Sequence, residues 1–177
     1  MVASPHRLAA CALVALFAAA PGVGAAEPAA PPAATEGPVT HLPLPRYVSL
    51  RAESANARRG PSMDQRVDWE FVRRGMPLQI TAEYGNWRRV RDADGAGGWV
   101  HQTMLSGTRT ALVLGTEPVE IRADPDPGTP IRARVEPGVV ARLNACAGAW
   151  CEITVDGERG WLSRSAIWGA GPEETFD

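Results

Sequence analysis

The stretch GNWRRVRDADGAGGWVHQTMLSG, residues 85–107, decides the fold because the chain contains it twice. The second copy, residues 148–169, reads GAWCEITVDGERGWLSRSAIWG. The first tryptophans of the two copies are 63 residues apart and the second tryptophans are 62 residues apart. Upstream, Gly75 is followed by Gly138, again at a spacing of 63. Two copies of a unit of about 60 residues therefore form the skeleton of the protein.

Each unit is predicted to be all-β. Short segments of alternating or β-branched residues are separated by Gly, Pro, Asn and Asp, the pattern of a small and strongly bent barrel. In the first unit Val67, Trp69 and Phe71 are expected on one face of a strand, because they alternate with charged residues. Residues 54–62 (SANARRGPS) are expected to form a turn-rich loop, and Met104-Leu105 a single helical turn.

The N-terminal part is predicted to lie outside the barrels. Residues 1–26 have a short basic start, an apolar run and small residues before Glu27, as in a secretory signal peptide. The run is too short to predict a membrane span, so no transmembrane segment is expected in the mature chain. Cys11 precedes the apolar run, which argues against a lipidation site. Residues 27–46 are rich in Pro and Ala and are expected to be a disordered linker.

The charge composition argues against a nucleic-acid partner. The net charge is −2, and all 18 basic residues are arginine. A nucleic-acid-binding domain of this size would carry a strongly basic face. The absence of lysine fits a GC-rich genome better than a special demand for anion binding.

Cys146 and Cys151 are the two cysteines left after the predicted signal peptide is removed, and they predict a disulfide in an exported protein. The spacing of 63 aligns them with Glu83 and Arg88 of the first unit. Both pairs flank the same tight turn, so the first unit is expected to fill this position with an exposed cross-strand ion pair. A metal or redox pair is the alternative; a metal site would need further ligands, for which His41 and His101 remain.

The motifs together resemble those of bacterial SH3 domains. The first unit contains N-x-R-x-G-P-S from Asn56, then G-x-P-L-x-I, G-N-W-R-R-V-R-D and G-W-V. The resemblance implies two tandem small SH3-like barrels, residues 47–107 and 108–169, followed by a C-terminal tail, residues 170–177. The second unit departs from the pattern, with Ile121-Arg122-Ala123-Asp124-Pro125 in place of N-x-R-x-G-P.

Four residues are candidates for ligand binding. Trp69 and Tyr84 are not part of a Gly-Trp dipeptide and are expected to be exposed. Arg89 and Arg91 alternate on a strand, so they should share one face, either as solvated exterior or as an edge that binds carboxylates. Trp99 and Trp161 also offer aromatic faces, but each follows a glycine, and for these two we favour the barrel core.

The sequence predicts a non-catalytic protein. It has no nucleophile-elbow motif, no cysteine with a catalytic histidine and no metal-ligand spacing, so no cofactor or metal is expected. The resemblance implies a periplasmic or secreted module that binds a cell-wall component, a peptide or a glycan of peptidoglycan. The alternative is an interaction or scaffolding factor that binds an envelope protein.

Overall fold

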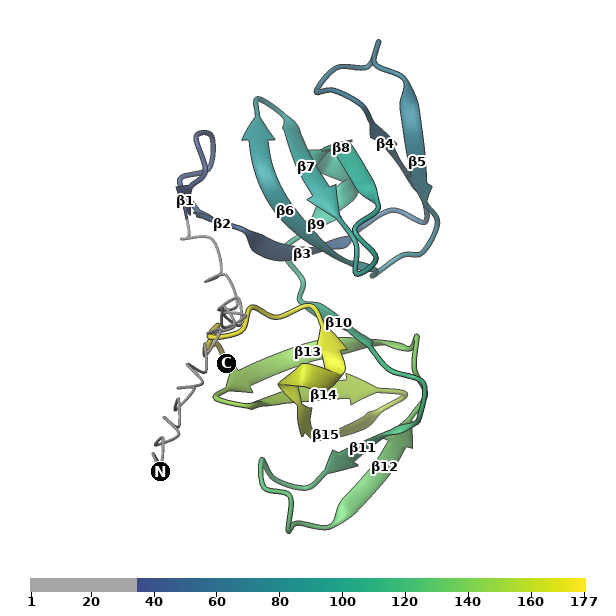
Figure 1. Cartoon of the computed structure of the whole chain (residues 1–177), viewed down its shortest axis with the longest axis vertical. Coiled ribbons are helices and arrows are strands. Elements are labelled where there is room, and N and C mark those ends of the chain that lie inside the picture. Colours follow the sequence, from purple (N-terminus) through teal and green to yellow (C-terminus); the bar gives the residue numbers. More distant parts are fainter. Residues whose placement is uncertain (1–34) are drawn as a thin grey trace, which may run out of the picture. The chain divides into compact units, whose positions relative to one another are not determined.

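The computed structural model describes residues 35–177, which fold into two separate seven-stranded antiparallel sheets and a short hairpin (Figure 1). The predicted signal peptide and residues 27–34 of the predicted linker lie outside the described residues. Each repeat forms one sheet, so the prediction of two tandem all-β barrels of one topology is confirmed.

The first barrel has the strand order β5-β4-β8-β7-β6-β3-β9. A 3-10 turn at Gln102–Met104 leads into its last strand, at the place where a helical turn is predicted. Its strands are β3 (Arg46–Leu50), β4 (Ala55–Arg58), β5 (Val67–Phe71), β6 (Pro77–Tyr84), β7 (Trp87–Arg91), β8 (Gly97–His101) and β9 (Leu105–Ser106).

The second barrel repeats this order as β12-β11-β15-β14-β13-β10-β16. A 3-10 turn at Arg164–Ala166 again precedes the last strand. Its strands are β10 (Thr110–Val113), β11 (Val119–Arg122), β12 (Ile131–Val135), β13 (Val140–Ala147), β14 (Trp150–Val155), β15 (Glu158–Ser163) and β16 (Ile167–Trp168).

The two cores fill equivalent positions with different side chains. In the first barrel Ala57 on β4 and Phe71 on β5 are buried, and the corresponding residues of the second barrel are Ile121 and Val135. A small and a large residue are thus replaced by two of intermediate size. Swaps that conserve total volume are the ones that a close-packed core tolerates best, so the repeats keep one topology although their core sequences differ.

The repeated Gly-Trp dipeptide has a steric cause. A Cβ atom on Gly98 would lie 2.6 Å from the carbonyl oxygen of Arg58, and one on Gly160 would lie 2.5 Å from that of Arg122. Strand β4 therefore crosses β8 so closely that only glycine fits there, and β11 crosses β15 in the same way. The glycine of each motif therefore allows the strand that carries Arg58 or Arg122 to approach the Gly-Trp strand closely.

Strands β4 and β11 were not predicted, because they lie within the segments expected to be turn-rich loops. Their buried residues include the small Ala55 and Ala57, which give a weak strand pattern. Of Val67, Trp69 and Phe71, which are expected on one face of β5, only Phe71 is buried, and Trp69 is exposed as predicted. Phe71 is 1% exposed, but Trp69 is 47% exposed. A register shift between β4 and β5 interrupts the alternation at this point.

Residues 35–46 have regular structure, whereas the sequence predicts that they belong to a disordered linker. Strands β1 (Thr35–Glu36) and β2 (Pro43–Leu44) form a hairpin, and Leu44 joins the first core. The turn of this hairpin surrounds the carboxylate of Glu83. The backbone N–H of Thr40 donates to Oε2 at 2.9 Å, and the Thr40 hydroxyl donates to Oε1 at 2.7 Å.

Glu83 and Arg88 face each other across β6 and β7, as the repeat predicts, but the pair is buried and not exposed. The Glu83 side chain has no exposed surface, and its closest cationic partner is Arg46, with Nη2 at 2.6 Å from Oε1. Burial by itself would raise the pKa of Glu83. The hydrogen bonds from Thr40, Arg46 and the Val39 amide outweigh it and lower the pKa to about 2.

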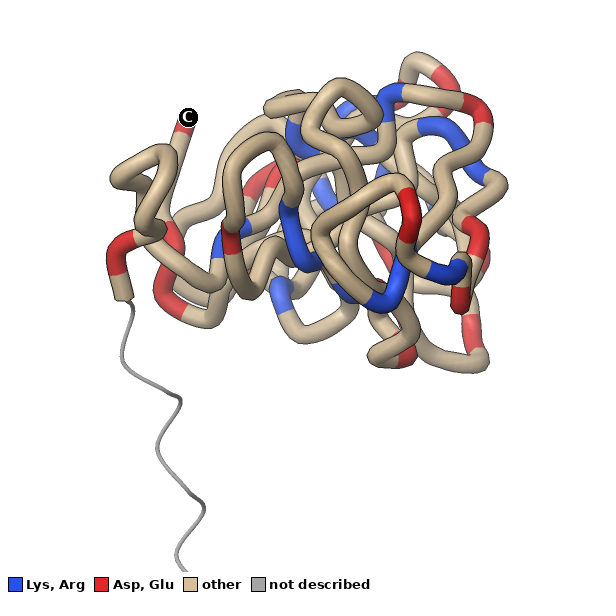
Figure 2. The backbone as a smooth tube through the Cα atoms, turned by 90° about the horizontal axis from the view of Figure 1, so that it is seen from above, with Lys and Arg blue, Asp and Glu red and all other residues tan. Residues whose placement is uncertain are grey.

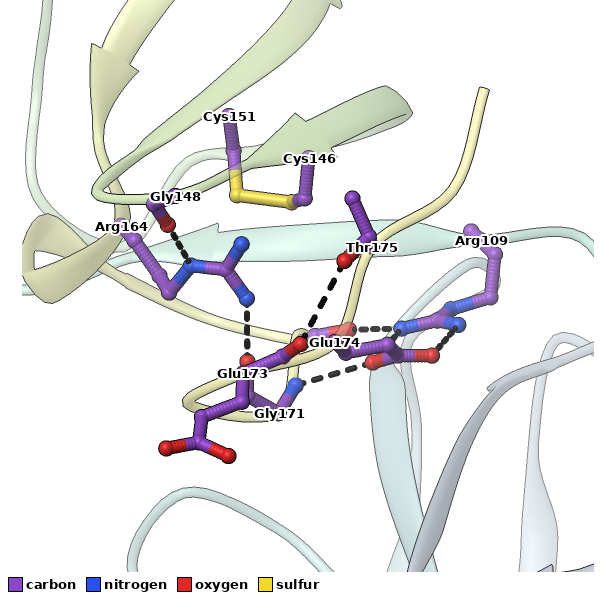
Figure 3. Close-up of a disulfide and its surroundings, with 10 residues drawn as sticks. Arg109, Cys146, Gly148, Cys151, Arg164, Gly171, Glu173, Glu174 and Thr175 are labelled. Atoms are coloured by element: carbon purple, nitrogen blue, oxygen red, sulfur yellow. Dashed lines mark hydrogen bonds and ion pairs between the residues drawn. A yellow bond between two sulfur atoms is a disulfide. The ribbon is translucent and has the colours of Figure 1, made fainter.

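The predicted Cys146–Cys151 disulfide is present at the equivalent position of the second barrel, where the two residues face each other across β13 and β14. The C-terminal tail lies beside it (Figure 3). The Cys146 amide donates to the Phe176 carbonyl at 2.9 Å. Glu174 forms a two-pronged ion pair with Arg109, with contacts of 2.5 and 2.9 Å. Residues 170–177 are therefore bound to this end of the barrel.

Candidate functional site

A groove of about 260 Å³ opens on the first barrel. It runs between β4 and β5 on one side and the end of β8 with the following 3-10 turn on the other. Asn56 and Arg58 are alternate residues of β4 and therefore share a face, while Ala55 and Ala57 have little exposed surface. The groove is lined by Ser54, Ala55, Asn56, Arg58, Met63, Glu70, Trp87, His101 and Met104.

The polar side chains of the groove have unused hydrogen-bonding capacity. Arg58 donates through Nη1 to the Gln65 carbonyl at 2.7 Å, and the rest of its guanidinium has no acceptor among residues 35–177. Glu70 lies opposite Asn56 in the β4–β5 pairing. Neither of these two side chains has a hydrogen-bond partner within the described part of the chain. The groove thus presents a positive, a negative and a neutral polar group to a ligand.

The apolar part of the groove consists of aromatic and methionine side chains. Trp87 and His101 meet edge to face, with ring centroids 5.4 Å apart. Nδ1 of His101 lies 2.8 Å from the Thr103 hydroxyl, which fixes the orientation of the imidazole. Met63 and Met104 are both exposed. A rigid aromatic pair together with flexible thioethers in one groove is a surface that suits an extended peptide or a sugar ring.

The second barrel has the same arginine but not the same free groups. Arg122 donates through Nη1 to the Thr129 carbonyl at 2.8 Å, as Arg58 does to Gln65. The strand pairing also places Arg58 opposite Trp99 and Arg122 opposite Trp161, so Arg122 is equivalent to Arg58 and the departure from the first motif is smaller than the sequence indicates. The sequence spacing of 63 misses this match by one residue.

The neighbours of Arg122 use the rest of its hydrogen-bonding capacity. Its Nη2 lies 2.5 Å from Oε2 of Glu120, which occupies the position of Asn56. Arg134, in place of Glu70, approaches the other oxygen of Glu120 at 3.4 Å. The three polar positions that are free in the first barrel thus satisfy one another in the second.

None of the four residues predicted from the sequence lines the groove. Trp69 is adjacent to Glu70 on β5 and therefore points away from the Glu70 face, and Tyr84 at the end of β6 is 65% exposed. Arg89 and Arg91 are both exposed and share one face of β7, as predicted. The guanidinium of Arg91 lies 5.7 Å from the ring centroid of Trp168, and its Nε donates to Gln79 at 2.8 Å.

The predicted burial of Trp99 and Trp161 is only partly correct. Both side chains are half-buried and neither belongs to the core clusters. They stand in the register positions opposite Arg58 and Arg122. The groove was not predicted from the sequence because the residues that mark it, Asn56 and Arg58, lie in a segment interpreted as a loop.

A larger cleft of about 640 Å³ lies along the end of the second barrel, beside Trp168 and the 3-10 turn. Its charged lining residue is Arg164, whose Nε donates to the Gly148 carbonyl at 2.8 Å and whose Nη1 donates to Gly171 (Figure 3). Because this guanidinium already binds two carbonyls, the cleft presents less free polar chemistry than the groove of the first barrel.

The surface charge is mixed. Basic and acidic positions are interspersed along the backbone (Figure 2), which agrees with the net charge of −2. Residues 35–177 hold no cluster of three or more His, Cys, Asp or Glu side chains that could bind a metal. In the same part of the chain, no helix has the length and apolar character that a membrane span requires.

The paired barrels, each with an arginine-bearing strand across a Gly-Trp strand, define the class of small tandem SH3-like proteins. The chain belongs to the bacterial SH3 domain family, whose family model matches residues 51–107 and 115–169. No curated protein matches the chain significantly.

Two solved structures of larger proteins are similar to parts of this chain. NlpC2 of Trichomonas vaginalis shares 14% identity over 71% of this chain and 48% of its own, with a TM-score of 0.34. NlpC1 of the same organism shares 14% identity over 70% of this chain and 45% of its own, with a TM-score of 0.33. The chain thus spans about half the length of these proteins.

Proposed function

We propose that the protein is a non-catalytic binding module of the cell envelope that recognises a peptidoglycan component through the groove of the first barrel. The observation that carries this proposal is the contrast between the groove of the first barrel and the equivalent position of the second. Equivalent polar residues are free in the first barrel, whereas in the second they are bound to one another. A free set of this kind, beside an aromatic pair, is what a binding site requires.

Two further observations support an envelope location. The family consists of bacterial SH3 domains, which are typically associated with cell-wall components. The Cys146–Cys151 disulfide suits an oxidising compartment such as the periplasm or the exterior. The predicted signal peptide, residues 1–26, agrees with export.

The test is retention of the mature protein on purified peptidoglycan sacculi. We expect the wild type to sediment with sacculi and the variants His101→Ala and Met104→Ala, which remove groove side chains, to do so less. Trp69→Ala and Tyr84→Ala are matched controls, since they remove exposed aromatic side chains outside the groove. Absence of wild-type retention at low salt would contradict the proposal.

A second candidate function is an interaction or scaffolding role in the periplasm. Apolar side chains are exposed on and around β5, with Met63 69%, Val67 39%, Trp69 47% and Val72 73% exposed. Exposed apolar clusters of this kind mark protein-binding surfaces. Under this alternative, Trp69→Ala would abolish capture of an envelope protein while the groove variants bind it normally. Tyr84 on β6 and Arg89 and Arg91 on β7 form part of the same proposal as exposed residues of the first barrel.

A further inference from the structure

The ion cluster of the second barrel indicates what the groove of the first barrel binds. Glu120 provides a carboxylate to Arg122 at 2.5 Å, and Arg122 also donates to the Thr129 carbonyl at 2.8 Å. The first barrel repeats the arginine and its carbonyl bond, but Asn56 replaces the glutamate. The second barrel therefore contains, within its own chain, the carboxylate that the first barrel lacks.

A second difference concerns the opposite wall of the groove. Arg134 of the second barrel pairs with Glu120, and the residue in its place in the first barrel is Glu70. The charge at this position is reversed, so the first groove has a cation on β4 and an anion on β5. A ligand that satisfies both must carry a negative and a positive group a short distance apart.

We propose that the groove of the first barrel binds a peptide through a free carboxylate on Arg58 and a free amine on Glu70. This inference rests on the proposed function and narrows its ligand from a peptidoglycan component to the peptide portion. An arginine guanidinium matches a carboxylate in geometry and charge, whereas a neutral glycan offers neither group. Trp87 and His101, which line the same groove, contact the apolar part of the peptide.

The first experiment measures binding of soluble peptides released from sacculi to the full mature chain by calorimetry at low salt. The peptides are used unmodified, with carboxylates methyl-esterified, or with amines acetylated. Loss of a charged hydrogen bond weakens binding roughly 10- to 100-fold, so we expect esterification to have this effect. Acetylation should weaken binding less, since Glu70 is more exposed than Arg58. Equal affinity for free and esterified peptides would overturn the proposal.

The second experiment moves the carboxylate between the barrels. Asn56→Glu supplies the first groove with the internal carboxylate of the second, and we expect it to weaken peptide binding at least about tenfold. Asn56→Gln is the matched variant of equal size without charge and should weaken binding much less than Asn56→Glu does. In the Glu70→Gln variant, acetylation of the peptide amines should no longer weaken binding, whereas esterification of the carboxylates should still weaken it. Circular dichroism of each variant shows that the barrels remain folded.

The reverse variant, Glu120→Asn, frees Arg122 in the second barrel. Arg134 remains close by, so this position should now bind carboxylates without regard to a free amine. We expect a second, weaker site in the titration, which Arg122→Gln on the same background removes. Wild-type affinity in a folded Asn56→Glu variant would overturn the proposal.

The outcomes separate the ligand chemistry from the proposed function. If sacculi retain the protein but neither esterification nor Asn56→Glu matters, the inference fails and the proposed function stands. If the peptide binds with the expected dependence but sacculi do not, the inference stands and the proposed envelope ligand is wrong. If neither binds, both are wrong.

Discussion

The same corner of the two barrels is stabilised by different chemistry. In the first barrel Glu83 and Arg88 face each other, and the buried carboxylate binds the N-terminal hairpin and Arg46. In the second barrel a disulfide occupies this position. Arg109, 63 residues after Arg46, therefore takes its carboxylate from the C-terminal tail at Glu174.

Both copies of the repeat thus keep an arginine that pairs with a carboxylate, but a different segment of the chain provides the carboxylate in each copy. Both arginines lie at the start of the strand that pairs with β6 or β13, and both require a buried or half-buried carboxylate. Once Glu83 is replaced by cysteine in the second copy, its arginine needs another partner. The chain provides one from the tail.

The largest effect is expected for Glu83→Ala. This substitution leaves Arg46, Arg88 and the Thr40 amide without their shared carboxylate, and removing one partner of a buried ion pair costs about 3–5 kcal/mol. Urea unfolding of the full chain measures the loss. Glu53→Ala, which breaks the exposed pair with Arg74, is the control and should cost less than about 0.5 kcal/mol. A loss below 1 kcal/mol for Glu83→Ala would mean that the hairpin does not depend on the carboxylate.

The next effect concerns pH and the same carboxylate. The pKa of Glu83 is lowered from 4.5 to about 2, so its stabilising contribution is complete above about pH 4.5 and is lost as the pH falls toward 2. At most about 3 kcal/mol is involved. The difference in unfolding free energy between wild type and Glu83→Gln should shrink over this range. A difference that stays constant from pH 7 to pH 2 would contradict the assigned pKa.

Reduction of the disulfide should have a smaller and local effect. The closed loop is short, so the bond is worth roughly 2 kcal/mol. Hydrogen exchange with and without reductant should show faster exchange in β13 and β14 and no change in β6 and β7. The Cys146→Ala/Cys151→Ala variant should reproduce the reduced protein without reductant. Equal acceleration in both barrels would show that the bond stabilises more than its own corner.

The smallest effect is expected for salt. The Glu83 side chain is fully buried and that of Arg88 is 5% exposed, so mobile ions screen this pair much less than a surface pair. Raising the salt concentration to about 0.5 M should change the stability of the first barrel by less than about 0.5 kcal/mol. A larger loss would support the exposed ion pair that the sequence alone suggests.

Much of the fold follows from the sequence because the repeat is visible in it. The repeated Gly-Trp motifs identify two units, and the spacing between them correctly predicts that Cys146 lies opposite Cys151. The burial of Glu83 does not follow, because its partners come from a Pro-rich leader without periodicity. Long-range partners of this kind leave no local pattern in a sequence.

The groove is harder to predict than the fold. Its polar residues lie on a four-residue strand, and the sequence spacing fails by one residue where Arg58 corresponds to Arg122. Aromatic residues such as Trp69 and Tyr84 are more conspicuous in the sequence, but they lie outside the groove. Free hydrogen-bonding capacity distinguishes the groove of the first barrel from the equivalent position of the second. It depends on three-dimensional contacts and therefore cannot be read from the sequence.

The N-terminal hairpin and the C-terminal tail, residues 170–177, have a consequence for how the protein can be divided into fragments. The segments matched by the family model, residues 51–107 and 115–169, exclude Arg46 with the hairpin and Arg109 with the tail. They also omit β3 and β10, the strands that pair with β6 and β13. Fragments cut at these borders would therefore expose a sheet edge and leave Glu83 without Arg46 and the hairpin. We expect autonomous folding only from fragments such as 35–107 and 108–177, in which each barrel keeps its terminal segment.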